Sequence, residues 1–183
     1  MAALALKFHI NPPKTDIERV MTPLDKVEAP QNLAQVEEAL KSAGEVVEAT
    51  YRTQVQTHVP LEVHNALVDF QGDHAVAWGS TQGTFSFRDE LSRPLEIPRE
   101  KIQFHCEHVG GGFGSKFGMG SEGDLAAKMS RKYNRPCRVL YSRKEQHLDM
   151  GMRPGSVQYM KIGVDKDGKL IGGRIHTAGA VGP

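Results

Sequence analysis

The sequence predicts an α+β fold, in which a mixed, largely antiparallel sheet is packed by a few helices. Three observations lead to this prediction. Strand-like segments outnumber helical ones, short turns containing Gly and Asp join neighbouring strands, and the helical segments are interspersed among the strands. A length of 183 residues, with 39% hydrophobic and 25% charged residues, is typical of a globular domain of this kind.

Charge and cysteine content exclude several classes of function. The chain has 23 basic and 22 acidic residues and no run of like charge, so we expect neither a nucleic-acid partner nor an anionic membrane surface. Cys106 and Cys137 match no zinc or iron–sulfur spacing and are interpreted as small buried hydrophobic residues. No segment approaches the roughly 20 apolar residues of a membrane span.

The first part of the chain predicts an arm followed by a helix. Residues 1–31 are polar and punctuated by proline, which favours an extended arm or linker. Residues 32–183 are then interpreted as part of one domain that is truncated at its C-terminal end. A short amphipathic helix is expected after Asn32, with Gly44 at its C-terminal cap. Its apolar face is formed by Leu33, Val36, Ala39 and Leu40.

The middle of the chain predicts strands at 45–53, 61–70 and 74–80. The last two are joined by Gln-Gly-Asp at 71–73, which is a hairpin signal. A helix is expected within 81–95 that breaks near Pro94, followed by an alternating strand at 101–109.

The last part of the chain begins with a glycine-rich segment, HVGGGFGSKFGMGSEGD, at 108–124. A helix is expected after it, capped by Ser121 or Asp124. The apolar stripe of that helix would consist of Leu125, Ala126, Met129 and Tyr133. A strand at 137–142 and a hairpin turning at 165–168 complete the predicted elements.

The glycine-rich segment lies between a predicted strand and a predicted helix, an arrangement that can present backbone N–H groups to an anion. Neither the GxGxxG spacing nor a P-loop can be written through it. A loose surface loop is the alternative. Phe113 argues against that alternative, because glycines around one aromatic residue suit a backbone that approaches a ligand closely while the side chain packs beneath.

Four stretches, taken together, resemble one known family. GGGFGSK in the glycine-rich segment is similar to the glycine loop of the molybdenum-binding subunit of xanthine dehydrogenases and aldehyde oxidases. Three further stretches resemble segments of that family in the same order: YRTQVQTHVPLEVHNA at 51–66, WGSTQGTFSFRDEL at 78–91 and SRKEQHLDMGMRPG at 142–155. The resemblance covers about three quarters of the chain.

The resemblance implies a set of cofactor-binding residues. In this family the glutamine of the Thr-Gln pair hydrogen-bonds an oxygen ligand of molybdenum, which assigns that role to Gln82. The backbone of the glycine loop lies against the molybdopterin cofactor, which assigns Phe113 and Gly114, with Gly111 and Gly112 as positions of close approach. A neutral amide can donate a hydrogen bond without adding charge, so the residue type suits the implied role.

The chain also departs from the family pattern. Members that act on purines often carry a glutamate directly after the loop lysine, whereas this chain has Phe117, which favours an apolar or aldehyde substrate. The family's catalytic glutamate lies in later sequence, so no catalytic residue and no metal ligand is assigned here. Glu62, Glu100 and Glu122 are interpreted as surface carboxylates.

The HxxH spacing of His105 and His108 suggests a metal site. On a strand, residues three apart face opposite sides, so these two are expected to be core or edge histidines instead.

The implied function is that of a fragment of a molybdenum hydroxylase, an oxidoreductase that hydroxylates aldehydes or aromatic heterocycles with oxygen from water. The expected partners are the rest of the molybdenum subunit, with iron–sulfur clusters and FAD on partner domains or subunits, in a cytoplasmic location with a periplasmic one left open. The fragment alone is expected to be inactive. A stand-alone binding or scaffold domain that kept the fold without catalysis is the alternative.

Overall fold

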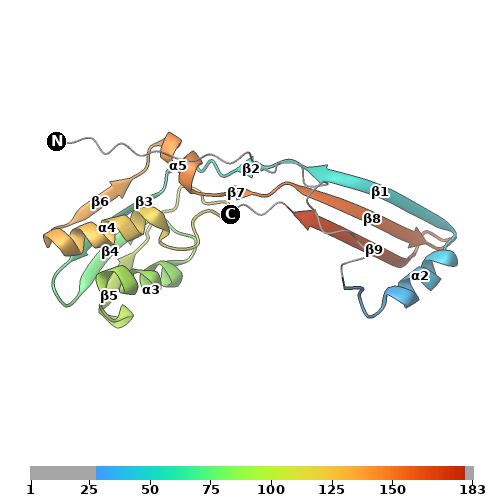
Figure 1. Ribbon diagram of the computed structural model, residues 1–183, viewed down its shortest axis with the longest axis horizontal. Helices are drawn as coiled ribbons and strands as arrows, with labels where there is room; N and C mark the ends of the chain where they lie inside the picture. Colours follow the sequence, from blue (N-terminus) through green and yellow to red (C-terminus); the bar gives the residue numbers. More distant parts are fainter. Residues whose placement is uncertain (1–27, 180–183) are drawn as a thin grey trace. The chain divides into compact units, whose positions relative to one another are not determined.

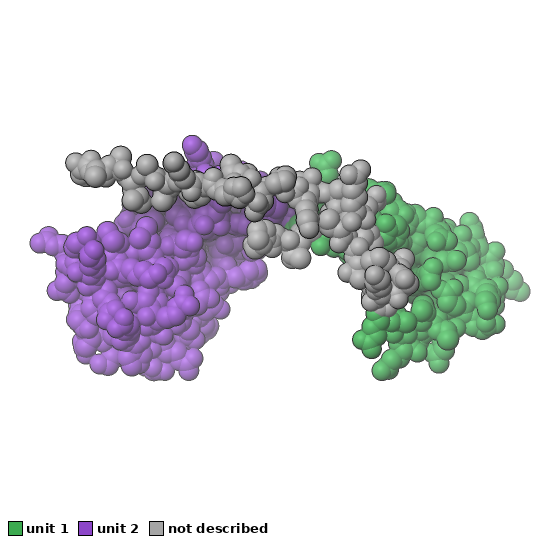
Figure 2. Space-filling model, viewed as in Figure 1, with its two compact units in different colours: residues 1–55, 154–183 green, residues 56–153 purple. Residues whose placement is uncertain are grey.

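The computed structural model describes residues 28–179, so most of the predicted arm lies outside the described residues. The chain forms two compact units, one of residues 1–55 with 154–183 and one of residues 56–153 (Figure 2). Each unit has its own sheet, and both sheets contain antiparallel pairs, which confirms the predicted class (Figure 1). The assignment of 32–183 to a single domain stays a prediction.

The first unit is a three-stranded antiparallel sheet in the order β1-β8-β9, with one helix packed on it. Strand β1 (Glu45–Thr53) pairs with β8 (Ser156–Val164), and β8 pairs in turn with β9 (Leu170–Gly179). The predicted hairpin at 165–168 is confirmed. Its turn is fixed by the Asp165 carboxylate, which accepts from two backbone N–H groups, and by Gly168, whose φ is +79°.

Helix α2 (Leu33–Lys41) packs on β8 and β9 through its buried residue Leu40. A side chain at Gly163 would collide with Leu40, so glycine in the strand allows the close approach. The predicted C-terminal cap was wrong, because the helix ends at Lys41 and its C-cap is Ser42, whose hydroxyl donates to the Ala39 carbonyl. Gly44 instead allows the chain to pass close to the backbone of the β8–β9 turn.

The second unit contains a four-stranded mixed sheet in the order β5-β4-β3-β6. The predicted hairpin joins β3 (Asn65–Phe70) to β4 (Ala75–Gly79), with β6 (Cys137–Leu140) antiparallel on the other side of β3. Strand β5 (Ile102–His105) is parallel to β4 and is preceded by a 3₁₀ turn, η2 (Arg99–Lys101). It is shorter than predicted, mainly because residues 106–109 belong to the loop that follows it. A two-residue ribbon pairs β2 (Gln56–Thr57) with β7 (Met152–Arg153).

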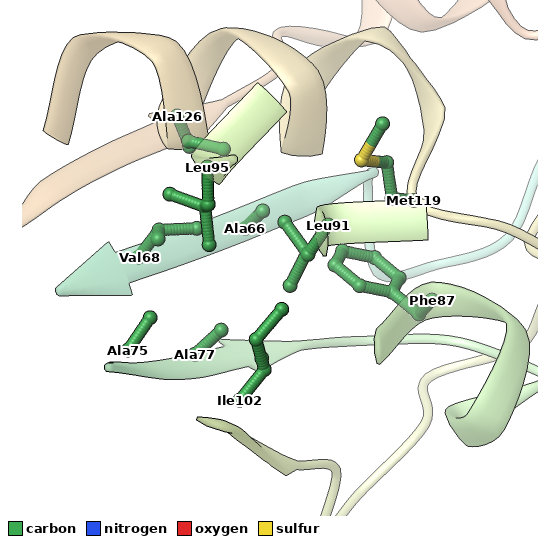
Figure 3. Close-up of a cluster of buried hydrophobic side chains, with 11 residues drawn as sticks. Ala66, Val68, Ala75, Ala77, Phe87, Leu91, Leu95, Ile102, Met119 and Ala126 are labelled. Atoms are coloured by element: carbon green, nitrogen blue, oxygen red, sulfur yellow. The ribbon is translucent and has the colours of Figure 1, made fainter. Parts of the chain in front are cut away.

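Helices α3 (Thr84–Leu95) and α4 (Gly120–Tyr133) contact each other and the strands of this sheet (Figure 1). The hydrophobic core of the unit is formed by residues of these helices and of the sheet, and its largest members include Phe87, Leu91 and Leu95 (Figure 3). Pro94 lies inside α3 and is buried, and the helix ends one residue later before Glu96 at φ +54°. The predicted break near Pro94 is therefore a helix end.

The inward face of α4 differs from the predicted one. Of the predicted stripe, Ala126 is buried as expected, but Leu125, Met129 and Tyr133 are exposed, and Ala127 is buried in addition. Small residues bring the helix close to the neighbouring strands, and Ser130 accepts a hydrogen bond from the backbone N–H of Phe70 at the end of β3. The predicted caps Ser121 and Asp124 both lie inside the helix, whose N-cap residue is Met119.

Helix α5 (Arg143–Asp149) follows β6 and begins with a capping box between Ser142 and Glu145. Among the residues that the structure describes, no helix has both the length and the apolar character needed to cross a membrane.

Candidate cofactor site around the glycine loop

The predicted strand–loop–helix arrangement is confirmed, since residues 106–119 connect β5 to α4. We call residues 106–119 the glycine loop. Its centre departs from ordinary backbone conformations, because φ is +92° at Gly111, +54° at Phe113 and +98° at Gly114. Such angles are easy for glycine and costly for phenylalanine, so the surrounding contacts must hold this conformation.

Gln82 is held directly against the glycine loop. Its backbone N–H donates to the Lys116 carbonyl at 2.6 Å, and its side-chain oxygen Oε1 accepts from the N–H of Gly114 at 2.9 Å and of Lys116 at 3.4 Å. With Oε1 engaged in this way, the amide nitrogen Nε2 is the end of the side chain left to donate. The structure therefore brings Gln82 into contact with Gly114, and both residues were assigned to the same cofactor site from the sequence.

Gly112 is buried against the same amide. A Cβ at this position would overlap Oε1 of Gln82, so only glycine leaves space for the amide there. Gly111 lies beside the Phe113 ring and Pro60, close to both.

Phe113 contradicts one detail of the sequence interpretation. Its side chain is 61% exposed and does not pack beneath the loop, and Phe117 is exposed to the same extent. The positive φ of Phe113 turns its side chain outward, so the loop is held by polar contacts and not by an aromatic anchor. Two aromatic faces are thereby presented to the surroundings next to Gly114 and Gln82.

A partly buried ion pair holds residues 110–116 of the loop, and the sequence interpretation missed it. The Lys116 side chain is fully buried, and its Nζ donates to the Glu62 carbonyl, to the Glu62 carboxylate and to the Ser80 hydroxyl at 2.9, 3.2 and 2.9 Å. The same carboxylate oxygen accepts from the N–H of Gly110 at 2.7 Å. Glu62 therefore contacts both ends of the segment 110–116.

The interpretation of Glu62 as a surface carboxylate was wrong. Burial alone would raise its pKa, but hydrogen bonds from Ser80 and Gly110 and the charge of Lys116 outweigh burial and lower the pKa to about 2. Glu62 is therefore ionised at neutral pH. Glu100, by contrast, is exposed and pairs with Arg99, so its surface assignment is confirmed.

Glu122 is also buried and not on the surface as predicted. It is 2% exposed, and its Oε2 has no hydrogen-bond partner among the described residues. Burial raises its pKa to about 7, and nearby Asp149 acts in the same direction while Lys116 opposes it. His64 is buried too and lies 3.0 Å through Nε2 from the Ser115 carbonyl, which makes Nε2 the protonated ring nitrogen.

The remaining candidate residues have structural surroundings. His105 stacks on Trp78, whereas His108 is exposed in the loop beyond the end of β5, so the two do not share a strand as predicted. Cys106 and Cys137 are free and only partly buried. Within residues 28–179 no three His, Cys, Asp or Glu side chains are grouped so that they could hold a metal ion.

We expect Glu122→Gln to change how stability depends on pH. The folded-state pKa of Glu122 is raised from 4.5 to about 7, so the folded chain binds more protons in that interval and its unfolding free energy falls as pH rises through it. The glutamine variant lacks this loss. It should match the wild type at pH 5 and exceed its unfolding free energy by about 2 kcal/mol at pH 8.

Urea denaturation of both proteins across this pH range measures the effect. The lowered pKa of buried His64 acts with opposite sign below its ordinary value, but it is present in both proteins and cancels in their difference. Parallel pH profiles for the two proteins would contradict the prediction.

We expect Gly112→Ala to destabilise the second unit by about 2 kcal/mol, because the new methyl group must displace the Gln82 amide from its two loop N–H groups. Gly173→Ala, in β9 of the first unit, is a control for adding a methyl group to a glycine, since its Cβ would make only ordinary contacts on an exposed strand. Chemical denaturation of both variants tests this. An equal effect at the two glycines would show that the Gln82 contact does not matter.

Comparison with known proteins identifies relatives of this arrangement. A family model described as the molybdopterin cofactor-binding domain matches residues 22–183. The aldehyde oxidoreductase molybdenum-binding subunit PaoC of Escherichia coli (strain K12) is 31% identical over 140 residues, which cover 76% of this chain and 19% of that protein. The probable hypoxanthine oxidase XdhD of the same strain is 27% identical over 152 residues, covering 83% of this chain and 16% of that protein.

Among solved structures, quinoline 2-oxidoreductase from Pseudomonas putida 86 has the same fold over 78% of this chain and 18% of that one, with a TM-score of 0.68 and 23% sequence identity. The chain therefore spans less than a fifth of the length of each of these proteins.

Proposed function

The chain belongs to the family of molybdopterin cofactor-binding domains, and we propose that its glycine loop and Gln82 hold part of that cofactor. The observation that carries the proposal is the orientation of the Gln82 amide. Both loop N–H groups that reach this side chain bind its oxygen, so the amide nitrogen is the group available to a ligand.

The residues of the loop suit an anionic cofactor rich in hydrogen-bond acceptors. The N–H groups of Gly111, Gly112 and Phe113 have no hydrogen-bond acceptor among the described residues. They are consecutive, and with Nε2 of Gln82 they form a set of neutral donors. Of the two carboxylates that hydrogen-bond to the loop, Glu62 is neutralised by Lys116, and Glu90 binds the N–H of Met119 at the end of the loop next to α4. Nothing in this set repels a phosphate or an oxo group.

The roles of the loop residues follow from these contacts. Gln82 would donate through Nε2, the three free N–H groups would receive acceptor atoms of the cofactor, and Gly114 would hold Gln82 in place. Bound molybdopterin supplies the redox chemistry, while the protein supplies orientation and hydrogen bonds. We assign no catalytic residue among the described side chains.

For the intact protein we propose an oxidoreductase of the xanthine dehydrogenase and aldehyde oxidase type. The named relatives support this class, and the exposed apolar ring of Phe117 at the loop favours an aldehyde or another apolar substrate over a purine. Electrons would pass to iron–sulfur clusters and FAD on partner domains or subunits, in the cytoplasm. The rest of the molybdenum subunit would complete the site.

Elemental mass spectrometry tests the proposal. The 183-residue chain and the complete gene product that contains it are expressed in a host that makes molybdopterin, and molybdenum is measured in each after desalting. We expect stoichiometric molybdenum in the complete product and little or none in the short chain. Absence of molybdenum from both would overturn the proposal and favour a non-catalytic scaffold domain.

A further inference from the structure

The peptide unit between Phe113 and Gly114 is held at both ends by side chains from different parts of the second unit. Its carbonyl oxygen, on Phe113, accepts from Nη2 of Arg153 at 3.1 Å. Its N–H, on Gly114, donates to Oε1 of Gln82 at 2.9 Å. Arg153 lies in β7 and Gln82 lies between β4 and α3, so one rigid plane is fixed by two distant segments.

This plane needs external support because of its backbone angles. Both flanking residues have positive φ, +54° at Phe113 and +98° at Gly114. Rotation of this peptide plane changes ψ of Phe113 and φ of Gly114, and a glycine at 114 accepts the angles of either orientation, so the backbone alone does not fix the plane. The charged hydrogen bond from Arg153 opposes that rotation, since a rotated plane would turn its N–H and not its oxygen toward the guanidinium.

The orientation of this peptide also decides which end of the Gln82 amide faces outward. With the plane as observed, the Gly114 N–H requires an acceptor, so Oε1 points to the loop. If the plane rotated, the Phe113 carbonyl would face Gln82, and the amide would turn to donate Nε2 to it. Nε2 of Gln82, the donor that we propose for the cofactor, would then be occupied by a hydrogen bond within the protein.

The fit of Arg153 to the loop is close. Its Nη2 lies 3.4 Å from where a Cβ of Gly114 would stand, and Nε2 of His58 lies 3.7 Å from the same point. The guanidinium therefore lies within van der Waals distance of position 114, next to the carbonyl of the preceding residue that it binds. Strand β7, in which Arg153 pairs with Gln56 of β2, holds the arginine backbone at this side of the loop.

We propose that Arg153 is a positioning residue, which fixes the Phe113–Gly114 peptide and thereby keeps the Gln82 amide nitrogen turned toward the cofactor. Its consequence for cofactor retention rests on the proposed function, whereas its effect on the peptide is a property of the chain itself. Arg153 acts through Gln82 and need not touch the cofactor.

Hydrogen exchange tests the effect on the peptide. In the complete gene product, Arg153→Ala is compared with the wild type and with Arg138→Ala, a change of an exposed arginine on β6 of the same unit. We expect exchange in the peptide covering 110–116 to rise about 10-fold in Arg153→Ala only, because one charged hydrogen bond is lost. Equal exchange in the two variants would overturn the proposal.

Chemical rescue and metal content separate positioning from general destabilisation. Millimolar guanidinium should restore protection of 110–116 in Arg153→Ala, and equimolar urea, which is planar but uncharged, should not. Failure of guanidinium to restore protection contradicts a specific role for the side chain. Molybdenum retention should fall in Arg153→Ala and recover with guanidinium.

The outcomes distinguish the two proposals. A wild type that holds molybdenum, with equal retention in Arg153→Ala, would overturn the role of Arg153 in cofactor binding and leave the proposed function standing. A wild type without molybdenum would overturn the proposed function, and exchange with guanidinium rescue would still decide whether Arg153 fixes the peptide.

Discussion

Lys116→Met should lower the unfolding free energy by about 3 kcal/mol, because it leaves the Glu62 carboxylate without its counter-charge in a partly buried position. Methionine retains most of the apolar stem, so the loss comes from the charge and its three hydrogen bonds and not from a cavity. The Glu62 side chain is about one third exposed, which places the expected loss at the lower end of the range for broken buried pairs. Urea denaturation at pH 7 measures it.

Two further variants make this result specific. Adding Glu62→Gln to Lys116→Met removes the stranded charge while leaving an oxygen for Ser80 and Gly110, so the double variant should recover much of the lost stability. Lys144→Met, at an exposed lysine on α5, should change the unfolding free energy by less than about 0.5 kcal/mol. A double variant no more stable than Lys116→Met alone would show that the charge imbalance is not the cause.

Local turn chemistry made the two hairpins predictable. Gly72 and Gly168 adopt the positive φ that their turns require, so sequence alone identifies both turns and the strands beside them. Helix α5 was not predicted, although Ser142 and Glu145 carry the spacing of a capping box and could have revealed its start.

The facing of α4 could not be predicted from hydrophobicity alone. The predicted stripe is buried only at its small member, Ala126, while its three larger members are exposed. The helix packs closely on β3 through Ala126 and Ala127, and large side chains are kept out of this contact. Interhelix and helix–sheet spacing is a tertiary property, and it overrides the local pattern.

The candidate site shows the same division between local and long-range information. Gln82 and the glycine loop could be assigned through a family resemblance, and the structure places them in direct contact. The partnership of Glu62 with Lys116 joins residues 54 positions apart, and no local pattern reports such a pairing. Opposite charges in two of the resembling stretches were the available signal. The orphaned carboxyl oxygen of Glu122 leaves no trace in sequence at all.

Gln82→Glu should lower molybdenum-dependent turnover of a probe aldehyde, benzaldehyde, by about 100-fold in the intact protein while leaving the loop folded. A carboxylate at position 82 can still accept from the N–H groups of Gly114 and Lys116, but it has no hydrogen to donate to the cofactor. Gln82→Met loses both functions and should also cost about 1 kcal/mol of stability.

The comparison between these two variants separates the donor role of Gln82 from its structural role. Turnover and molybdenum content are measured together with thermal unfolding, and Gln103→Glu, at an exposed glutamine on β5, is the control for added negative charge. If Gln82 only supports the loop, the glutamate variant should be as active as the wild type and only the methionine variant impaired. Gln82→Glu preserves the oxygen contacts to the loop and removes only the amide nitrogen. Unchanged turnover with intact molybdenum content in this variant would therefore exclude the amide nitrogen as a donor to the cofactor.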